Sequence, residues 1–271
     1  IVKKLLKALS CPYGVTNNNS ANISASIGIA IYPDDGLNAE TLLNNADTAM
    51  YKAKEKGKNN FQFFTEAMNT KIALYSELEQ ELRIAIQEEK LCLYYQPIYD
   101  ANNEKIVAAE ALIRWPHETK GLICPDQFIP LAEETGLIVP LGKWIIGSAA
   151  EFSAKINQNL TQPVRVAINI SSCQCFDDGK EILALIQDIQ SKSPSPGLID
   201  LEITESMLMS PSQNIISFMQ QIRQLGLGIH LDDFGTGYSS LSYLKRFPIT
   251  KLKIDRSFIQ NIIEDAEDGK L

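Results

Sequence analysis

The chain has 271 residues, of which 45% are hydrophobic and 21% are charged, a composition typical of a soluble globular protein with room for more than one domain. Its net charge of −8 argues against a protein that binds nucleic-acid polymers, because such proteins normally carry a surplus of positive charge. No stretch approaches the roughly 18 apolar residues of a membrane span. The five cysteines are odd in number and mostly scattered, so we expect them to be reduced and mostly buried, in a cytoplasmic protein.

Residues 1–64 predict a partial α/β unit. Apolar residues recur at helical spacing over Ile1–Leu9, and Ile23–Tyr32 alternates like a strand that leads into a Pro-Asp-Asp-Gly turn. A second helix is expected over Asn38–Lys56 and a short strand over Asn59–Phe64. Because the chain starts within a helical pattern and without a methionine, we expect it to be a segment of a longer protein.

A long polar helix over about Glu66–Glu89 predicts a linker at residues 65–90. From residue 91 onward, strands alternate with helices, beginning with two strands, Leu91–Tyr99 and Ile106–Trp115, that are close enough to form an antiparallel hairpin. The elements expected after the hairpin are helices 125–135 and 139–159, strand 164–170, helix 179–191, strand 198–203, helix 212–226, strand 227–231, helix 239–247, strand 251–254 and the start of a helix at Ser257.

The alternation predicts parallel βαβ units, and polar residues at the strand ends indicate a (β/α) barrel whose loops carry the site. A closed barrel of this kind needs eight strands, of which the sequence supplies six. We therefore expect an α/β fold whose barrel is truncated after the sixth strand.

Five apolar stretches each contain polar or charged residues in or at the end of a predicted strand. These residues are Glu110, Asn169, Glu202, Asp232, Asp233 and Lys253. Burying a carboxylate without a partner is costly, and carboxylate and amide oxygens are the ligands that Mg²⁺ and Mn²⁺ prefer. The set therefore predicts a divalent-metal site that acts on phosphate esters.

Taken singly, several of these residues have other interpretations. Glu110 and Arg114 share a strand face, so they either bind a metal and a phosphate or form an exposed ion pair. Asn169 also suits a strand-end cap, and Lys253 is either a solvated lysine or a residue beside a metal-bound water. Asp232–Gly237 is the strongest signal, because a polar turn does not explain two acids directly behind an apolar strand.

Three further residues complete the expectations about the site. Glu205 lies just past the strand that carries Glu202 and is expected to accept a hydrogen bond from a neighbouring loop. His230 predicts a core histidine with its hydrogen bonds satisfied, whereas His117 is expected on a loop and exposed. With two histidines in the chain, a zinc hydrolase or a histidine-based nuclease is disfavoured.

These residues lie in motifs that resemble those of the EAL-domain cyclic di-GMP phosphodiesterases. The signature is Glu110-Ala111-Leu112, followed by Ile113-Arg114-Trp115. The further motifs, in the family's order, are Tyr95-Gln96-Pro97-Ile98, Asn169-Ile170-Ser171, Leu201-Glu202-Ile203-Thr204-Glu205, Asp232–Gly237 and Lys253-Ile254-Asp255. Six separated motifs over residues 75–271 make a chance match very improbable.

The resemblance implies a (β/α)₈ barrel of EAL type with its first strand antiparallel, and hydrolysis of cyclic di-GMP to linear pGpG with two Mg²⁺ or Mn²⁺ ions. The metal ligands that it implies are Glu110, Asn169, Glu202, Asp232 and Asp233. The catalytic residues that it implies are Glu110, Asp232 and Lys253, with Lys253 at the attacking water. The residues implied to contact the ligand are Gln96, Leu112 and Arg114. Glu205 would hold the loop that starts at Asp233.

Residues 1–64 resemble the C-terminal part of a GGDEF domain, the diguanylate cyclase fold. The matching segments are Ser26–Ala30, Ala46–Tyr51 and Lys52–Asn59. The signature turn and metal-binding acids of that domain would lie upstream, so no cyclase activity is expected of this chain. In the EAL family a further glutamate and a glutamine would lie beyond Leu271. We therefore predict a GGDEF part at 1–64, a linker helix at 65–90 and a C-terminally incomplete EAL domain at 91–271.

Two functions follow from these expectations. One is a metal-dependent phosphodiesterase of bacterial second-messenger signalling, supported by the nearly complete set of metal ligands up to Lys253. The other is a non-catalytic cyclic di-GMP receptor or signalling scaffold. The resemblance also implies a homodimer and a parent protein with an upstream sensor domain, in which this chain is cytoplasmic even where the parent is anchored in a membrane.

Overall fold

The computed structural model describes residues 1–10, 13–15, 19–21, 24–57, 59–192, 198–208, 213–235 and 244–258. The chain divides into two compact units, Ile1–Gln80 and Glu81–Leu271. No helix in the described ranges combines the length and the apolar character needed to cross a membrane.

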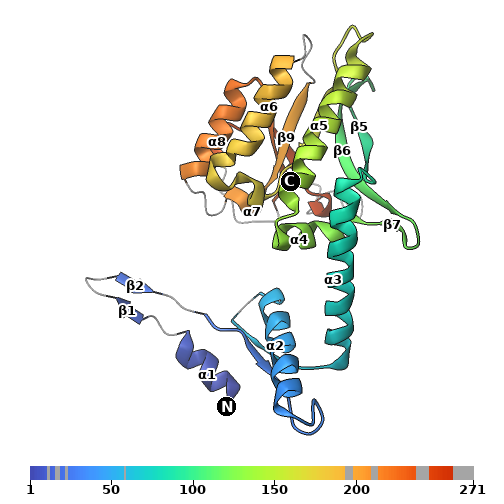
Figure 1. The fold of residues 1–271 in the computed structure, drawn as a ribbon. Helices are drawn as coiled ribbons and strands as arrows, with labels where there is room; N and C mark the ends of the chain where they lie inside the picture. The colour runs from blue at the N-terminus through green and yellow to red at the C-terminus, as the bar shows by residue number, and fades with distance from the viewer. Residues whose placement is uncertain are drawn as a thin grey trace. The chain divides into compact units, whose positions relative to one another are not determined.

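The first unit packs one helix on a small parallel sheet (Figure 1). It contains α1 (Val2–Leu9), β1 (Tyr13–Val15), β2 (Asn19–Ala21), β3 (Ile27–Ile29), α2 (Ala39–Glu55) and β4 (Phe61–Phe63). Strand β3 pairs with β4, and β1 pairs with β2 in a hairpin that the sequence pattern does not predict. Helix α2 lies close on β3, because a Cβ added at Gly28 would fall 1.8 Å from the Ala46 carbonyl oxygen. Helix α3 (Glu66–Gln87) follows, as predicted.

The second unit is built on one curled sheet. Its strands are β5 (Cys92–Tyr99), β6 (Ile106–His117), β7 (Gly121–Ile123), β8 (Arg165–Asn169), β9 (Ile199–Thr204), β10 (Ile229–Phe234) and β11 (Lys251–Ile254). The order across the sheet is β11-β10-β9-β8-β6-β5, and β7 pairs only with β6. The β5–β6 pair is antiparallel, and the pairs from β6 to β11 along this order are parallel. The six predicted strands and the antiparallel first strand are therefore confirmed.

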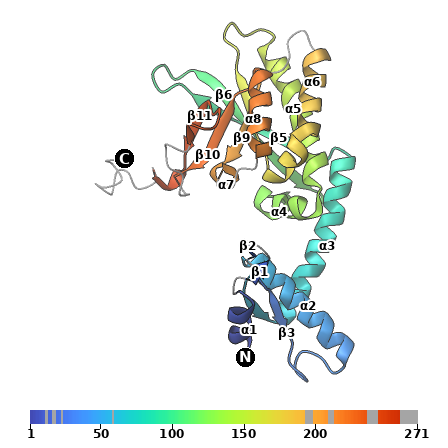
Figure 2. The ribbon, with the colours of Figure 1, turned by 90° about the vertical axis from the view of Figure 1, so that its left-hand side faces the viewer.

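The helices of this unit lie on one face and at one end of the sheet (Figure 2). They are α4 (Pro125–Thr135), α5 (Ile138–Asn157), α6 (Lys180–Lys192), α7 (Glu205–Leu208) and α8 (Gln213–Gln224), with 3₁₀ turns η1 (Ser172–Gly179) and η2 (Arg256–Phe258). The predicted helices up to residue 226 are confirmed with small shifts at their ends. The helix predicted over 239–247 falls largely outside the described residues.

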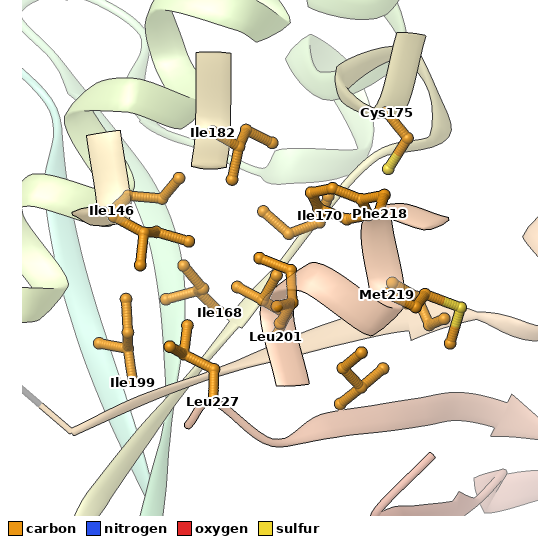
Figure 3. Close-up of a cluster of buried hydrophobic side chains, with 14 of the residues drawn as sticks. Ile146, Ile168, Ile170, Cys175, Ile182, Ile199, Leu201, Phe218, Met219 and Leu227 are labelled. Carbon is orange, nitrogen blue, oxygen red and sulfur yellow. The ribbon is translucent and has the colours of Figure 1, made fainter. Parts of the chain in front are cut away.

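The core lies between the sheet and α5, α6 and α8 (Figure 3). Alternate strand residues such as Ile168, Leu201 and Leu231 are buried against helix residues such as Ile186 and Phe218. Because side chains of a strand alternate between faces, the residues between these apolar positions lie on the opposite face. That opposite face is polar, and it carries the predicted site.

Two expectations about exposure are wrong. The cysteines are not mostly buried: of the four described, Cys175 is buried, Cys92 and Cys173 are partly exposed and Cys124 is exposed. All four are free thiols. His117 is not an exposed loop residue, because β6 continues through Pro116 to pair with β7, and its side chain is 13% exposed beside Glu81.

Candidate functional site

The strand register brings the predicted residues together on the polar face of the sheet. Asn169 on β8 pairs with Glu202 on β9, which pairs in turn with His230 on β10. Gln96 on β5 pairs with Glu110 on β6. Residues in register on neighbouring strands share a face. Glu110 is in register with Ala167, two residues before Asn169, so the polar side chains form two adjacent rows on the same face.

Lys253 lies on β11, the last strand of this order next to β10, and its side chain reaches the carboxylates of this face. Its Nζ donates hydrogen bonds to Glu202 Oε2 at 2.6 Å, to Glu110 Oε2 at 2.9 Å and to Asp232 Oδ2 at 3.0 Å. Glu202 is fully buried, whereas Glu110 and Asp232 are partly exposed. One cation thus joins three carboxylates that come from three different strands.

The charges of this cluster depend on one another. Burial alone would lower the pKa of Lys253, but the carboxylates of Glu202 and Glu110 outweigh burial and raise it. Burial alone would raise the pKa of Glu202, but hydrogen bonds from His230 and Lys253 outweigh burial and lower it. These opposite shifts favour an ammonium group at Lys253 and a carboxylate at Glu202.

The carboxylates also have the arrangement that a divalent cation requires. Glu110, Glu202 and Asp232 each offer an oxygen, and these oxygens lie within 4.8 Å of one another. Asn169 lies beside them, with its Nδ2 donating to Glu110 Oε1 at 3.0 Å. Carboxylate and amide oxygens are the donor set that Mg²⁺ and Mn²⁺ prefer, so the residues present fit such an ion.

Asp233 stands apart from that group of three carboxylates. Its backbone N–H donates to Asp232 Oδ1 at 3.0 Å, and its backbone is left-handed, with φ of 54°. Burial and the neighbouring carboxylates of Asp232 and Asp255 raise its pKa. The side chain is exposed, at the end of β10 where the pairing with β11 shifts register.

Glu205 lies at the start of α7 and is buried, with 2% of its surface exposed. Its Oε2 accepts a hydrogen bond from the backbone N–H of Gly235 at 3.0 Å. The structure therefore places Glu205 against the segment that follows Asp233.

The residues predicted to contact a ligand lie on β5 and β6. Leu112 and Arg114 share a face with Glu110, and Gln96 is exposed next to Glu110. The Arg114 guanidinium lies 5.5 Å from the centre of the Tyr94 ring and donates through Nη1 to the Ile113 carbonyl at 2.8 Å. Tyr94 is thus a further exposed residue on this face, and its pairing with Leu112 in a predicted hairpin was the signal that could have found it.

A buried polar chain beneath the cluster was not recognised from the sequence. His230 is 2% exposed, with Nδ1 3.2 Å from Glu202 Oε1 and Nε2 3.4 Å from Asp200 Oδ2. Asp200 in turn accepts hydrogen bonds from Arg165 Nε at 2.8 Å and Nη2 at 2.6 Å. His230 is therefore a core histidine between two acids, as expected for its burial, but the expectation that its hydrogen bonds are satisfied is wrong, because Nε2 makes no hydrogen bond among the described residues. The signal available was the spacing of Asp200 and Glu202 on one strand face.

Comparison with known proteins bears on this arrangement. Residues 79–271 match the EAL domain, and residues 1–60 match the family described as diguanylate cyclase, GGDEF domain. The bifunctional diguanylate cyclase/cyclic di-GMP phosphodiesterase MucR of Pseudomonas aeruginosa is 40% identical over 271 residues, which is 100% of this chain and 39% of MucR. The cyclic di-GMP phosphodiesterase PdeR of Escherichia coli is 44% identical over 239 residues, which is 88% of this chain and 36% of PdeR.

The fold is also that of a solved relative. The structure of the MucR phosphodiesterase in complex with c-di-GMP matches with a TM-score of 0.65 and 39% identity, over 72% of this chain and 78% of that chain. The resemblance seen in the sequence motifs is thereby confirmed. The chain belongs to the EAL-domain family, preceded by a segment that matches the GGDEF domain.

Proposed function

We propose that this chain hydrolyses cyclic di-GMP to linear pGpG with the help of Mg²⁺ or Mn²⁺, two ions being used. The observation that carries the proposal is the convergence of Glu110, Glu202 and Asp232 on Lys253. Four charged groups from four strands meet at one point of the sheet, which costs free energy unless a ligand or a metal uses them. MucR and PdeR, which are named as cyclic di-GMP phosphodiesterases, are similar to this chain.

Five residues would hold the metal. They are Glu110, Asn169, Glu202, Asp232 and Asp233. When bound, a divalent ion supplies positive charge for the phosphate oxygens and makes a bound water a better nucleophile. Glu202 is buried and fixed by hydrogen bonds, so it brings a charge whose position is set before the metal arrives.

Lys253 would act with Glu110 and Asp232 in catalysis. Its raised pKa keeps it as an ammonium group, which donates hydrogen bonds and does not accept a proton. Its role is therefore to hold the attacking water and to balance negative charge near the phosphate, rather than to act as a base.

Gln96, Leu112 and Arg114 would bind the dinucleotide. Arg114 carries a fixed positive charge on the same face as Glu110, which suits a phosphate oxygen of a metal-bound ester. Gln96 offers an amide and Leu112 an apolar surface beside it. Glu205 would stabilise the segment after Asp233 through its hydrogen bond to Gly235.

The chain spans less than two fifths of MucR and of PdeR, so the organisation of the whole protein is part of the proposal. We retain a GGDEF part at 1–64, a linker at 65–90 and an EAL domain at 91–271. An upstream sensor domain, a homodimer and a cytoplasmic location of this segment complete the proposal.

Turnover of cyclic di-GMP tests the function. With Mg²⁺ or Mn²⁺ present, the protein should release pGpG, and Glu110→Gln should reduce kcat by at least 100-fold because a metal ligand is lost. Glu181→Gln removes an exposed carboxylate on α6 and serves as the matched control, with activity near that of the wild type. Binding of cyclic di-GMP without any cleavage would instead establish a receptor and overturn the catalytic roles.

A further inference from the structure

We propose that His230, whose imidazole lies between Glu202 and Asp200, is a positioning residue that holds one oxygen of Glu202 and leaves the other for the metal. The inference rests on the proposed function, because it concerns the metal ligands of that site. It gives a role in the site to the polar chain formed by Arg165, Asp200, His230 and Glu202.

The two oxygens of Glu202 have separate partners. Oε1 accepts from His230 Nδ1 at 3.2 Å, whereas Oε2 is 2.6 Å from Lys253 Nζ, on the side of Glu110 and Asp232. A carboxylate held at one oxygen has lost most of its rotational freedom before any ion binds. Its second oxygen is then directed to the point where the other two carboxylates converge.

On its other side the imidazole faces a second acid, without a hydrogen bond to it. Its Nε2 lies 3.4 Å from Asp200 Oδ2, and Asp200 is held by the Arg165 guanidinium and by the backbone N–H of Gly228. A Cβ at Gly228 would lie 2.6 Å from Asp200 Oδ1, so the carboxylate occupies space that only glycine leaves. The chain Arg165–Asp200–His230–Glu202 therefore links the start of the strands to the metal ligands at their ends.

A purely structural role explains these contacts less well. Arg165 already neutralises Asp200 with two hydrogen bonds, so Asp200 does not require a histidine. An apolar side chain at position 230 would fill the same buried space without desolvating an imidazole. What an apolar residue cannot supply is a donor to Glu202 Oε1, and this is the contact that bears on the site. Partners of metal-binding side chains commonly tune metal affinity in this way.

Two substitutions at position 230 test whether the hydrogen-bond donor to Glu202 matters, or whether any polar side chain at this position would serve. The amide nitrogen of Asn lies near the position of imidazole Nδ1, which faces Glu202, whereas that of Gln lies near Nε2, which faces Asp200. Affinity for Mn²⁺ is measured by calorimetry without cyclic di-GMP, so the readout does not depend on turnover. We expect His230→Gln to weaken Mn²⁺ binding by about tenfold or more and His230→Asn to retain most of the affinity.

Ser153→Ala is the stability control. Ser153 is fully buried and bonds the backbone of Leu198, away from the carboxylates, so its loss should lower the melting temperature and leave Mn²⁺ affinity unchanged. Equal Mn²⁺ affinity of the wild type and His230→Gln would overturn the inference and leave the proposed function intact. Equal weakening in both variants at position 230 would also overturn it. A wild type that binds no Mn²⁺ would overturn the metal site together with the inference.

Discussion

Asp233 has a left-handed backbone, which costs conformational free energy at a position next to the site. A non-glycine residue in this region loses about 1–2 kcal/mol relative to ordinary backbone, and Asp is among the residues that tolerate it best. In this conformation the backbone N–H of Asp233 donates to Asp232 Oδ1 at 3.0 Å. Strain of this kind is often found where function, rather than stability, selects the residue.

Substitution at Asp233 should reveal this strain. Asp233→Gly should be more stable than Asp233→Ala by about 1 kcal/mol, because glycine adopts positive φ freely and alanine does not. Both variants lack the carboxylate, so the difference isolates the backbone. Urea unfolding of the two proteins measures it, and indistinguishable midpoints would mean that the backbone at 233 is not strained.

At the scale of elements, the site depends on how closely β9 and β10 approach each other. The Asp200 carboxylate occupies the space beside Gly228, directly before β10 begins. The same contact supplies a hydrogen bond from the Gly228 N–H to Asp200. A side chain at 228 would push the acid away from Arg165 and from His230.

Gly228→Ala should therefore destabilise the protein by about 1–3 kcal/mol, the usual range for overpacking a close contact. Gly147→Ala is the matched control: it lies within α5, nothing lies within 4 Å of an added Cβ, and alanine should stabilise the helix by up to about 1 kcal/mol. Thermal unfolding of both variants gives the comparison. A Gly228→Ala protein as stable as the wild type would show that the acid moves without cost.

The end of α3 is a second place where an element is held by charge. Glu81 lies 2.5 Å from Lys120 Nζ and 3.3 Å from His117 Nε2, beside β6 and β7. The hydrogen bond from Lys120 is the main reason that the pKa of Glu81 lies below its ordinary value, against a smaller opposing effect of burial.

This shift predicts a pH dependence at the acid end. A carboxyl whose pKa is lowered by folding stabilises the protein fully above its unfolded pKa of about 4.3, and this contribution disappears as pH falls through the folded pKa. Glu81→Gln should lower the free energy of unfolding by about 0.5–1 kcal/mol at pH 7, since the pair is partly exposed to solvent. The difference from the wild type should vanish near pH 2, as urea unfolding at both pH values would show. A difference that persists at pH 2 would argue against the ion pair as its cause.

For the whole molecule, divalent metal should stabilise the fold without being required for it. Ions that bind the folded state alone raise its stability in proportion to the logarithm of their concentration above Kd. Because Lys253 already joins the three carboxylates, removal of metal with EDTA should leave a cooperative unfolding transition. Calorimetric melting should show a higher Tm with Mn²⁺, and a Glu202→Gln protein should lose that increase. Unfolding on addition of EDTA at 25 °C would contradict this expectation.

Local sequence patterns predict much of this fold, and the rest depends on contacts between residues that are distant in the sequence. Alternation within β6 and β9 marks both the buried face and the acids on the other face, so the strands and the convergence of Glu110, Glu202 and Asp232 are predictable. Strands of three residues, such as β1 and β7, are too short to give a periodic signal. His230 reads as a core residue because its partners Asp200 and Glu202 lie on another strand and meet it only through the register.

The Lys253 ammonium group would affect how a metal ion binds to the neighbouring carboxylates. Its positive charge lies between the carboxylates of Glu110, Glu202 and Asp232, which would otherwise repel one another. A divalent ion that binds there would therefore compete with the Lys253 ammonium group for the three carboxylates. Selection between ions then depends on charge density as well as on size, because a monovalent ion offers the carboxylates no more charge than the lysine already does.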